Sequence, residues 1–335
     1  MKSELSGQHK KLFLTVKELI QQARQQVVRN VNQVMVTTYY EIGRMIVEEE
    51  QQGNKRADYG KEVIANLSKE LTKEFEKGFT TRYLELMRKF YITYSKTKSV
   101  ISEFKLSWTH YIRLIRVEDE NERKFYEIES INNNWSVREL NRQFDTALYQ
   151  RLALSRDKEG IKKLNQKGQI LEKPKDIIKE PYVLEFLGLK EDNRYSESDL
   201  ETAIIDKLEY FLLELGKGFA FIGRQKRISI NNKHFFIDLV FYNRILKCFL
   251  LIDLKIGELK HQDLGQMLMY VHYYDRDVKL EDENPTIGLV LCSENDKTIV
   301  EYTLPKDNKQ IFASQYKTVL PSKKKLQQII NDSIE

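Results

Sequence analysis

The sequence has few of the features that mark secreted or membrane-spanning proteins. Only two of its 335 residues are cysteines, Cys248 and Cys292, and both lie inside apolar runs. Two such thiols provide neither a disulfide framework nor the ligand spacing of a zinc site. No apolar run approaches the ~20 residues that a membrane-spanning helix needs, and the first residues lack the apolar core of a signal peptide. These absences predict a cytoplasmic protein with reduced, buried thiols.

A large excess of charge of one sign is also missing. The chain has 55 Lys and Arg against 50 Asp and Glu, for a net charge of +5. Residues 1–150 hold 25 basic and 21 acidic residues, and the remainder hold 30 and 29. The small surplus in the N-terminal part permits a nucleic-acid partner without establishing one. The length is sufficient for two domains, each with its own core.

The first part of the chain has the apolar spacing of helices. A long first helix is expected over residues 8–50, and shorter ones are expected over 61–75, 81–94, 108–115 and 120–131. Ser136 and Glu139 form a capping-box pattern that opens a last helix, which we expect to end near Leu152. We therefore predict an all-helical N-terminal domain, residues 1–160, that binds DNA or assembles the protein into a homo-oligomer.

The second part alternates between helices and strands. The polar stretch Ser155–Pro181 holds two of the five prolines, and within it we predict a linker, residues 161–180. A helix over 200–215 is then expected to precede strands at 219–230, 235–242 and 247–256. Another helix at 262–274, strands near 286–292 and 309–313, and a helix from Ser322 complete the pattern. It predicts an α/β (α+β) domain over 181–335, with a mixed sheet flanked by helices.

Two of these strands contain charged residues in otherwise apolar runs. Asp238 interrupts the first, and Asp253 and Lys255 interrupt the second. Because side chains alternate along a strand, Asp253 and Lys255 project from one face. Unpaired buried charges are costly, so these three side chains require partners or a metal ion.

The connection between the two strands adds a geometric constraint. A turn centred on residues 244–247 would place Asp238 opposite Asp253, with Cβ atoms about 4.5–5.5 Å apart. Two bare carboxylates at that distance repel each other. A hard divalent cation, Mg²⁺ or Mn²⁺, would remove the repulsion, and Lys255 would orient a metal-bound water or stabilise charge on a phosphate. The alternative is structural: a buried Asp253–Lys255 salt bridge, with Asp238 bonded to backbone.

Longer strings around these residues form a more specific pattern. In the C-terminal part they are Phe235-Phe236-Ile237-Asp238-Leu239, Ile252-Asp253-Leu254-Lys255, Gly265-Gln266-Met267 and Tyr270. In the N-terminal part they are Tyr40-Glu41-Ile42-Gly43-Arg44, Met87-Arg88-Lys89-Phe90-Tyr91, Leu106-Ser107-Trp108 and Trp135-Ser136-Val137-Arg138-Glu139-Leu140. Together these strings resemble, nearly end to end, the YhcG-type (DUF1016) branch of the PD-(D/E)xK nuclease superfamily.

The resemblance implies a restriction-endonuclease-like fold and an Mg²⁺-dependent phosphodiesterase. Its metal ligands would be Asp238 and Asp253, and Lys255 would be the catalytic lysine. Two residues depart from the pattern. Ile237 replaces the proline that gives the motif its name, and Asp253 stands where this branch more often has Glu.

Three further residues are candidates for the same site. Glu201 occupies the position of an N-terminal helix acid that would bind metal. The alternative is that Glu201 closes a capping box with Ser198. Gln266 matches the polar residue that such families direct toward the site, and we include it among the catalytic residues. Tyr270 lies one turn later on the same side of the helix and is a candidate nucleic-acid contact.

Basic residues supply the remaining candidate nucleic-acid contacts. Arg224 and Lys226 alternate on one strand, and Lys260 precedes a helix; for these the alternative is a solvated surface charge. The predicted helices 61–75 and 81–94 have the outline of a helix-turn-helix. Its second helix carries Arg82, Arg88 and Lys89. The alternative for this pair is an ordinary helical hairpin with an aromatic core.

These observations favour a metal-dependent nuclease that hydrolyses nucleic-acid phosphodiester bonds, in the first place a DNA endonuclease. The alternative is a non-catalytic nucleic-acid-binding or scaffold protein that retains the nuclease fold. A third reading makes the N-terminal helices a protein-interaction module that tethers the nuclease domain to a partner.

Overall fold

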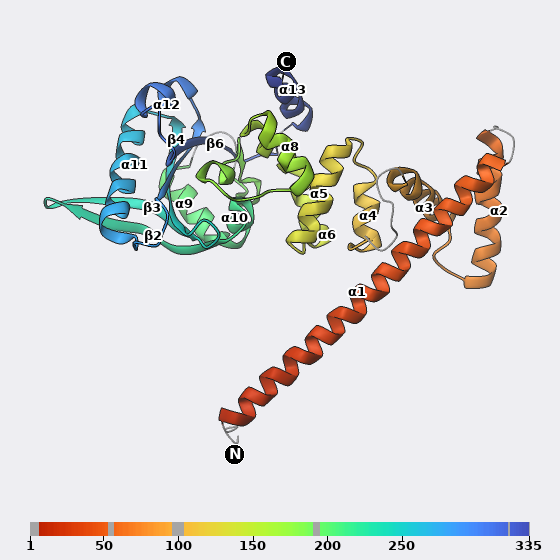
Figure 1. Cartoon of the computed structure of the whole chain (residues 1–335). Coiled ribbons are helices and arrows are strands. Elements are labelled where there is room, and N and C mark those ends of the chain that lie inside the picture. The colour runs from red at the N-terminus through yellow and green to blue at the C-terminus, as the bar shows by residue number, and fades with distance from the viewer. Residues whose placement is uncertain (1–6, 53–56, 96–103, 190–194, 321, 335) are drawn as a thin grey trace. The chain divides into compact units, whose positions relative to one another are not determined.

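The computed structural model describes residues 7–52, 57–95, 104–189, 195–320 and 322–334 (Figure 1). Contacts divide the chain into two compact units, Met1–Asn141 and Arg142–Glu335. The division falls before the domain end predicted at residue 160, because the segment after Arg142 packs with the second unit. Among the described residues, none of the helices combines the length and the apolar character that crossing a membrane requires.

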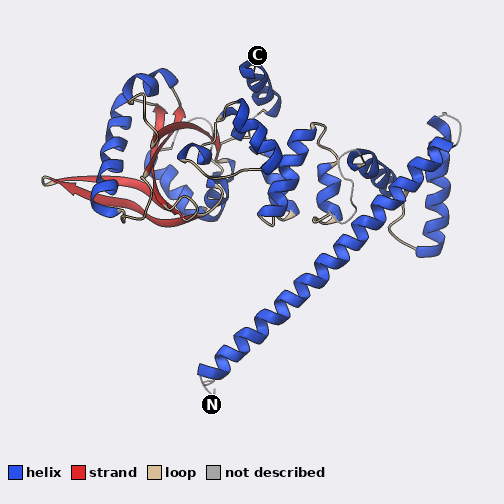
Figure 2. Cartoon of the chain, viewed as in Figure 1, coloured by secondary structure: helices blue, strands red, loops and turns tan. Residues whose placement is uncertain are grey.

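The described part of the first unit is helical, as predicted (Figure 2). Its helices are α1 (Gly7–Gln52), α2 (Ala57–Phe75), α3 (Thr81–Tyr94), α4 (Trp108–Leu114), α5 (Glu120–Asn132) and α6 (Val137–Asp145), which runs across the division. The capping box at the start of α6 is present, with Ser136 N donating to Glu139 Oε2 at 2.6 Å. The helix expected to continue to Leu152 is interrupted at Ala147, whose φ of 53° is left-handed.

A close crossing of α1 and α3 organises the first unit. A Cβ atom on Gly43 would lie 2.1 Å from the carbonyl oxygen of Met87, so only glycine allows this approach. Beside the crossing, Tyr40 and Phe90 pack edge to face, and Phe90 also contacts the ring of Tyr111 at a centroid distance of 5.0 Å. Two aromatic residues of α3, Phe90 and Tyr94, are therefore in the core of this unit, as the helical-hairpin alternative predicted, whereas Tyr83 is exposed.

Six strands in the described part of the second unit form one mixed sheet in the order β1-β6-β5-β4-β3-β2. The strands are β1 (Tyr182–Val183), β2 (Phe219–Ile230), β3 (Lys233–Asn243), β4 (Cys248–Glu258), β5 (Ile287–Glu294) and β6 (Ile311–Lys317). Strands β2, β3 and β4 are antiparallel neighbours, whereas β4, β5, β6 and β1 run parallel. This is the mixed sheet that the alternation of elements predicted.

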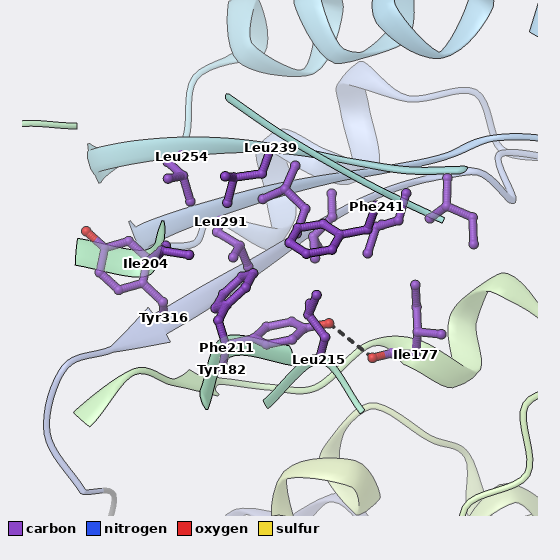
Figure 3. Close-up of a cluster of buried hydrophobic side chains, with 14 of the residues drawn as sticks. Ile177, Tyr182, Ile204, Phe211, Leu215, Leu239, Phe241, Leu254, Leu291 and Tyr316 are labelled. Atoms are coloured by element: carbon purple, nitrogen blue, oxygen red, sulfur yellow. Dashed lines mark hydrogen bonds between the residues drawn. The ribbon is translucent and has the colours of Figure 1, made fainter. Parts of the chain in front are cut away.

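Helices cover both faces of this sheet. On one face lie α9 (Glu197–Asp206) and α10 (Leu208–Leu215). Figure 3 shows their residues Ile204 and Phe211 beside Leu239, Phe241 and Leu254 of the sheet. On the other face α11 (His261–Tyr273) packs through apolar residues of its own, and the cluster there includes Leu264, Met267, Val240, Leu251 and Val290. One helix was expected over 200–215, but the backbone breaks at Lys207, whose Nζ donates to the Phe186 carbonyl at 2.7 Å.

The segment predicted to be a linker contributes to the core. It includes most of α8 (Lys158–Lys167) and the 3₁₀ turn η2 (Pro174–Ile177). Ile177 is buried, and its carbonyl accepts a hydrogen bond from the Tyr182 hydroxyl at 3.0 Å (Figure 3). The low apolar content of this segment did not indicate that its few apolar residues are buried. The remaining elements are α7 (Leu148–Leu154), η3 (Glu185–Leu187), the π-helical turn η4 (Tyr274–Val278), α12 (Lys297–Thr303) and α13 (Lys323–Ile334).

A buried charge network joins α7 to α10. The guanidinium of Arg151 pairs with the carboxylate of Glu214, and both side chains are fully buried. The Lys179 ammonium donates to the Glu214 carbonyl, and the Val183 amide donates to Glu214 Oε1 at 3.0 Å. Burial raises the pKa of Glu214, but the Arg151 and Lys179 charges outweigh that effect and lower it below the ordinary value. The carboxylate therefore stays ionised inside the core.

Breaking this network should destabilise the second unit. We expect Arg151→Met to lower its free energy of unfolding by about 3–5 kcal/mol, because Glu214 would be left buried without its main partner. Denaturant unfolding followed by circular dichroism measures the loss. The matched control is Lys163→Met, which breaks the exposed Lys163–Glu159 pair of α8 and should change nothing measurable. Equal stability of Arg151→Met and the unsubstituted protein would contradict the proposed role of the network.

Candidate active site

The pairing of β3 with β4 ends at the candidate site. Leu239 pairs with Ile252 and Asn243 with Cys248, so the turn spans 244–247 as predicted. One step beyond the last pair, Asp238 and Asp253 occupy opposite positions. Asp238 Oδ2 accepts a hydrogen bond from the Leu254 amide at 2.7 Å. The strands thus separate at this point. The Leu254 amide donates to a side-chain oxygen of Asp238, where in a continuous ladder it would donate to a backbone carbonyl of the neighbouring strand.

Asp253 and Lys255 lie on one face of β4 and contact each other. Lys255 Nζ is 2.9 Å from Asp253 Oδ2. Asp253 is only 2% exposed, whereas Lys255 is partly accessible. Lys255 Nζ also lies 3.7 Å from Glu197 Oε2, at the start of α9. Lys255 therefore lies close to the carboxylates of both Asp253 and Glu197.

The negative charges of these carboxylates exceed the positive charge of Lys255. Burial, and then the negative charge of Asp238, raise the pKa of Asp253 to about 7, although Lys255 opposes the shift. Burial lowers the pKa of Lys255, but the carboxylates of Asp253, Glu197 and Asp238 outweigh it and raise that pKa above the ordinary value. The lysine is therefore held as a cation, and the carboxylates together still carry more negative charge than it neutralises.

Glu201 is joined to Asp238 through Gln225. The helix cap consists of Ser196 and Asp199, not of Ser198 and Glu201 as the alternative had it. Glu201 is 7% exposed. Gln225 Nε2 donates to Glu201 Oε2 at 2.5 Å and to Asp238 Oδ1 at 3.0 Å. Burial raises the pKa of Glu201, with Asp238 adding to the shift and Gln225 opposing it.

Sequence reasoning missed Gln225. It stands between two basic residues on β2, and only the β2–β3 register, in which Lys226 pairs with Ile237 and Arg224 with Leu239, reveals that it faces Asp238. Its φ of 47° is also invisible in the sequence. Its two basic neighbours form no part of the hydrogen-bonded bridge itself. Arg224 is exposed and its charge lowers the pKa of Glu201, while the side chain of Lys226 folds back over Gly223.

Gln266 and Tyr270 connect α11 to β3 behind the site. The Gln266 amide donates to the Tyr270 hydroxyl, which in turn donates to the Phe236 carbonyl at 3.0 Å. Tyr270 is fully buried. The ring lies in the core, so Tyr270 is not accessible in this structure for the nucleic-acid contact that we expected. The hydroxyl instead holds the backbone two residues before Asp238, which is a positioning role.

The other basic candidates lie outside this cluster. Lys260 is exposed at the start of α11, and its backbone amide donates to Asp263 Oδ2 at 2.8 Å. In the first unit Arg82 and Lys89 are exposed on α3. Arg88 is paired with Glu50 of α1, with Arg88 Nε 2.7 Å from Glu50 Oε2. Arg82 and Lys89 are therefore accessible to a phosphate, whereas Arg88 already forms an ion pair with a carboxylate.

The structure contains the contacts of the structural alternative: an Asp253–Lys255 pair, and Asp238 bonded to backbone. Within the described ranges, no three His, Cys, Asp or Glu side chains converge closely enough to form a preformed metal cluster. Mg²⁺, however, is commonly held by one or two carboxylates with water and phosphate completing its shell. Asp238 and Asp253 occupy opposite strand positions, and the negative charge of Asp238 acts on Asp253, so these two carboxylates fit that requirement.

The chain matches models of two protein families. A mixed sheet flanked by helices, with an Asp on one strand and an Asp-x-Lys on the next, defines the PDDEXK class of nuclease domains. Residues 175–331 match the YhcG PDDEXK nuclease domain, and residues 15–151 match the DUF1016 N-terminal domain. The chain is 40% identical to "Putative nuclease YhcG" of Escherichia coli (strain K12) over 338 residues, covering 92% of this chain and 90% of that protein. The chain belongs to the YhcG family of PDDEXK nuclease-domain proteins.

Solved structures give weaker likenesses. A repair endonuclease from Pyrococcus abyssi matches with a TM-score of 0.25 and 15% identity, over 40% of this chain and 50% of that chain. An EndoMS–dsDNA complex matches with a TM-score of 0.26 and 14% identity, over 36% and 45%. The matched region spans about half the length of these proteins, and TM-scores this low add nothing to the family assignment.

The raised pKa of Asp253 can be tested without metal. In the metal-free protein, Asp238→Asn should lower it, because the variant removes the neighbouring charge and keeps an acceptor for the Leu254 amide. Carboxyl ¹³C chemical shifts followed over pH report the change. A folded-state pKa above the ordinary value means that the stability contributed by Asp253 is present at low pH and lost as the pH rises through about 7. An unchanged pKa in Asp238→Asn would show that Asp238 does not act on Asp253.

Proposed function

We propose that this protein is a divalent-metal-dependent endonuclease that hydrolyses DNA phosphodiester bonds at the site of Asp238, Asp253 and Lys255. The observation that carries the proposal is the placement of two facing carboxylates and one lysine where two strands separate. Membership of a nuclease-domain family supports the class of reaction. The cation and the DNA substrate are our inference from the hard oxygen ligands and from the exposed basic residues of the neighbouring strand β2.

Each residue has a distinct role in this proposal. Asp238 and Asp253 would hold Mg²⁺ or Mn²⁺, which when bound supplies Lewis-acid polarisation of the phosphate and an acidified water. Lys255 remains a cation and stabilises negative charge on the phosphate. Gln225 keeps Asp238 and Glu201 in fixed relation, and Glu201 is the candidate for an additional, more distant ligand. Gln266 and Tyr270 fix the backbone that carries Asp238.

One observation favours the non-catalytic alternative. Lys255 and Asp253 already neutralise each other in part. A protein that kept the fold for binding alone would retain this pair as a buried ion pair. Substitution of the pair separates the two functions, since turnover depends on it and binding of nucleic acid at exposed basic residues does not.

Turnover should depend on Asp253 and Lys255. With Mg²⁺ or Mn²⁺ present, we expect Asp253→Asn and Lys255→Met each to reduce DNA cleavage at least about a hundredfold, as loss of a charge-stabilising catalytic group does. Cleavage is followed by gel electrophoresis of labelled DNA, and circular dichroism checks the fold. Glu301→Gln, an exposed change on α12, is the matched control. Cleavage that is indifferent to both site variants would support the non-catalytic alternative.

We also propose that the first half of α1 pairs with α1 of a second copy of this chain. A stripe of apolar side chains runs along it, with Leu12, Leu19, Val27 and Val34 each more than 60% exposed. Their spacing of seven and eight residues keeps them on one side of the helix. The residues of α1 buried in the first unit, such as Val36, lie on a different side, so the stripe is not part of that core.

The residues that flank the stripe favour a parallel pair. One flank carries Lys17 and Arg24, and the other carries the uncharged Gln22, Gln26 and Gln33. In a parallel pair the two different flanks meet, so the basic residues face amides. In an antiparallel pair like flanks meet, and the basic residues would face one another. Asn30 lies within the stripe, where a single asparagine is known to select two-stranded assembly.

The assembly proposal predicts a change of mass. Val27→Lys should convert a dimer of the full chain into a monomer, because it places a charge in the apolar stripe of both copies. Light scattering coupled to size-exclusion chromatography measures the mass. Gln21→Lys, on the opposite side of the same helix, adds the same charge and should leave the dimer intact. A monomeric unsubstituted protein, or a dimer that survives Val27→Lys, would refute the pairing.

A further inference from the structure

The β2–β3 hairpin extends well beyond the rest of the sheet. Strand β3 pairs with β4 only from Leu239 to Asn243, whereas its outer half, residues 233–238, pairs with β2 alone. The strands are joined at Asn231 and Asn232, whose positive φ values of 48° and 62° are typical of a tight hairpin turn. The result is a two-stranded ribbon that begins at Asp238 and projects past α11 (Figure 1).

The two faces of this ribbon differ. Ile228 and Ile237 are buried in the cluster formed with α11, and Phe235 packs against that cluster. The opposite face starts with the Gln225–Asp238 hydrogen bond of the candidate site. It continues outward through two cross-strand pairs, Arg227 with Phe236 and Ser229 with His234. We refer to these four residues as the outer ribbon face.

The outer ribbon face is exposed and chemically mixed. Phe236 is 48% exposed, and none of the described aromatic residues stacks on its ring. The guanidinium of Arg227 forms no ion pair within the described part of the chain, and the residue is exposed. Ser229 Oγ and His234 Nδ1 lie 2.9 Å apart. An exposed cation beside an exposed aromatic ring is the combination that binds a phosphate and stacks on a base.

Geometry connects this face to the catalytic centre. Strand residues two apart point to the same side and are separated by about 6.4–6.8 Å. Phe236 therefore lies one such step from Asp238, and His234 lies two steps away. The Phe236 carbonyl is held by the Tyr270 hydroxyl, so the ring and the Asp238 carboxylate are carried by one fixed backbone segment. A polymer that is cut at Asp238 would have to cross this face in one direction.

We propose that the outer ribbon face binds an unpaired nucleic-acid strand that leads away from the cleaved phosphodiester bond. Arg227 contacts a phosphate of that strand, and Phe236 stacks on one of its bases. The strand is unpaired because a base offers its flat face to an aromatic ring only when it is unstacked from its neighbours. Helix α11 covers the opposite face, so the inner part of the ribbon cannot insert into the groove of a duplex, where both of its faces would have to be free. The inference deepens the proposed nuclease function and rests on it.

Binding measurements on the full chain test the inference separately from catalysis. Fluorescence anisotropy in EDTA would compare a labelled single-stranded oligonucleotide with a duplex of the same sequence. We expect the single strand to bind more tightly. Phe236→Ala should weaken its binding about 5- to 100-fold, as loss of a stacking aromatic does. Arg227→Gln should weaken it and reduce the slope of its salt dependence by about one contact.

The ribbon supplies a matched control. Lys233 is exposed, carries the same charge as Arg227, and lies on the other face of the ribbon, paired with Ile230. Lys233→Gln should leave single-strand affinity within about twofold of the unsubstituted protein, since it contacts none of the proposed path. If Lys233→Gln and Arg227→Gln lose equal single-strand affinity, the loss reflects only the net charge of the protein, and the proposal is overturned. So would an unchanged affinity in Phe236→Ala, equal affinity for duplex, or no binding of either nucleic acid.

Failure of the nuclease proposal gives a different result. Asp253→Asn should abolish cleavage and retain the single-strand affinity, because Asp253 is buried away from the outer ribbon face. If the unsubstituted protein binds single strands through Arg227 and Phe236 but cleaves nothing with Mg²⁺ or Mn²⁺, the nuclease proposal fails and the binding face stands. If it cleaves normally while Phe236→Ala and Arg227→Gln bind as the unsubstituted protein does, the binding face fails and the nuclease stands.

Discussion

The burial of the Asp253 carboxylate beside a second carboxylate is the constraint on which the site depends. Apolar clusters on both faces of the sheet exclude water from β4, so the charge on Asp253 is poorly solvated. The only cation in contact with it is Lys255 among the described residues, and Asp238 adds a like charge. The separation of β3 from β4 opens the sheet where this imbalance lies. A cation that enters there would relieve a repulsion that the fold itself creates.

A second buried carboxylate in the same unit shows that burial alone does not produce this imbalance. Glu214 is fully buried, yet its pKa is lowered, because Arg151 and Lys179 outweigh burial and backbone and side-chain donors surround its oxygens. Asp253 is almost as buried, yet its pKa is raised. The difference lies in the partners: Glu214 has an excess of cations, and Asp253 has an excess of carboxylates. The first arrangement stabilises the fold, whereas the second leaves negative charge that a bound cation would neutralise.

Much of the site could be predicted because strands have simple rules. Alternation placed Asp253 and Lys255 on one face, and the length of the turn set Asp238 opposite Asp253; both follow from local spacing. Gln225 could not be found in this way, because its role depends on the register of a neighbouring strand and on a local φ of 47°. The helix breaks at Ala147 and Lys207 were missed because neither position has a glycine or proline that would mark a break in the sequence.

Predictions about individual side chains were limited by burial, which spacing does not reveal. Tyr270 was placed correctly beside Gln266 on one side of α11, but an aromatic residue on that side can face solvent or core. The structure places it in the core, with its hydroxyl directed to the Phe236 carbonyl. The polar segment before residue 180 presented the opposite case, since a low apolar content concealed Ile177 in the core. Composition averages over a segment, whereas burial is decided residue by residue.

The hydrogen bond from the Leu254 amide to Asp238 also bears on the short side chain at position 253. An aspartate reaches one methylene less far than a glutamate would at this position, so the carboxylate of Asp253 stays close to β4. Asp238 Oδ2, 2.7 Å from the Leu254 amide, is itself drawn toward β4. The carboxylate of Asp238, on β3, is therefore held close to β4. Gln225 holds the other oxygen of Asp238 from the β2 side, so two hydrogen bonds from the protein itself fix the position of this carboxylate.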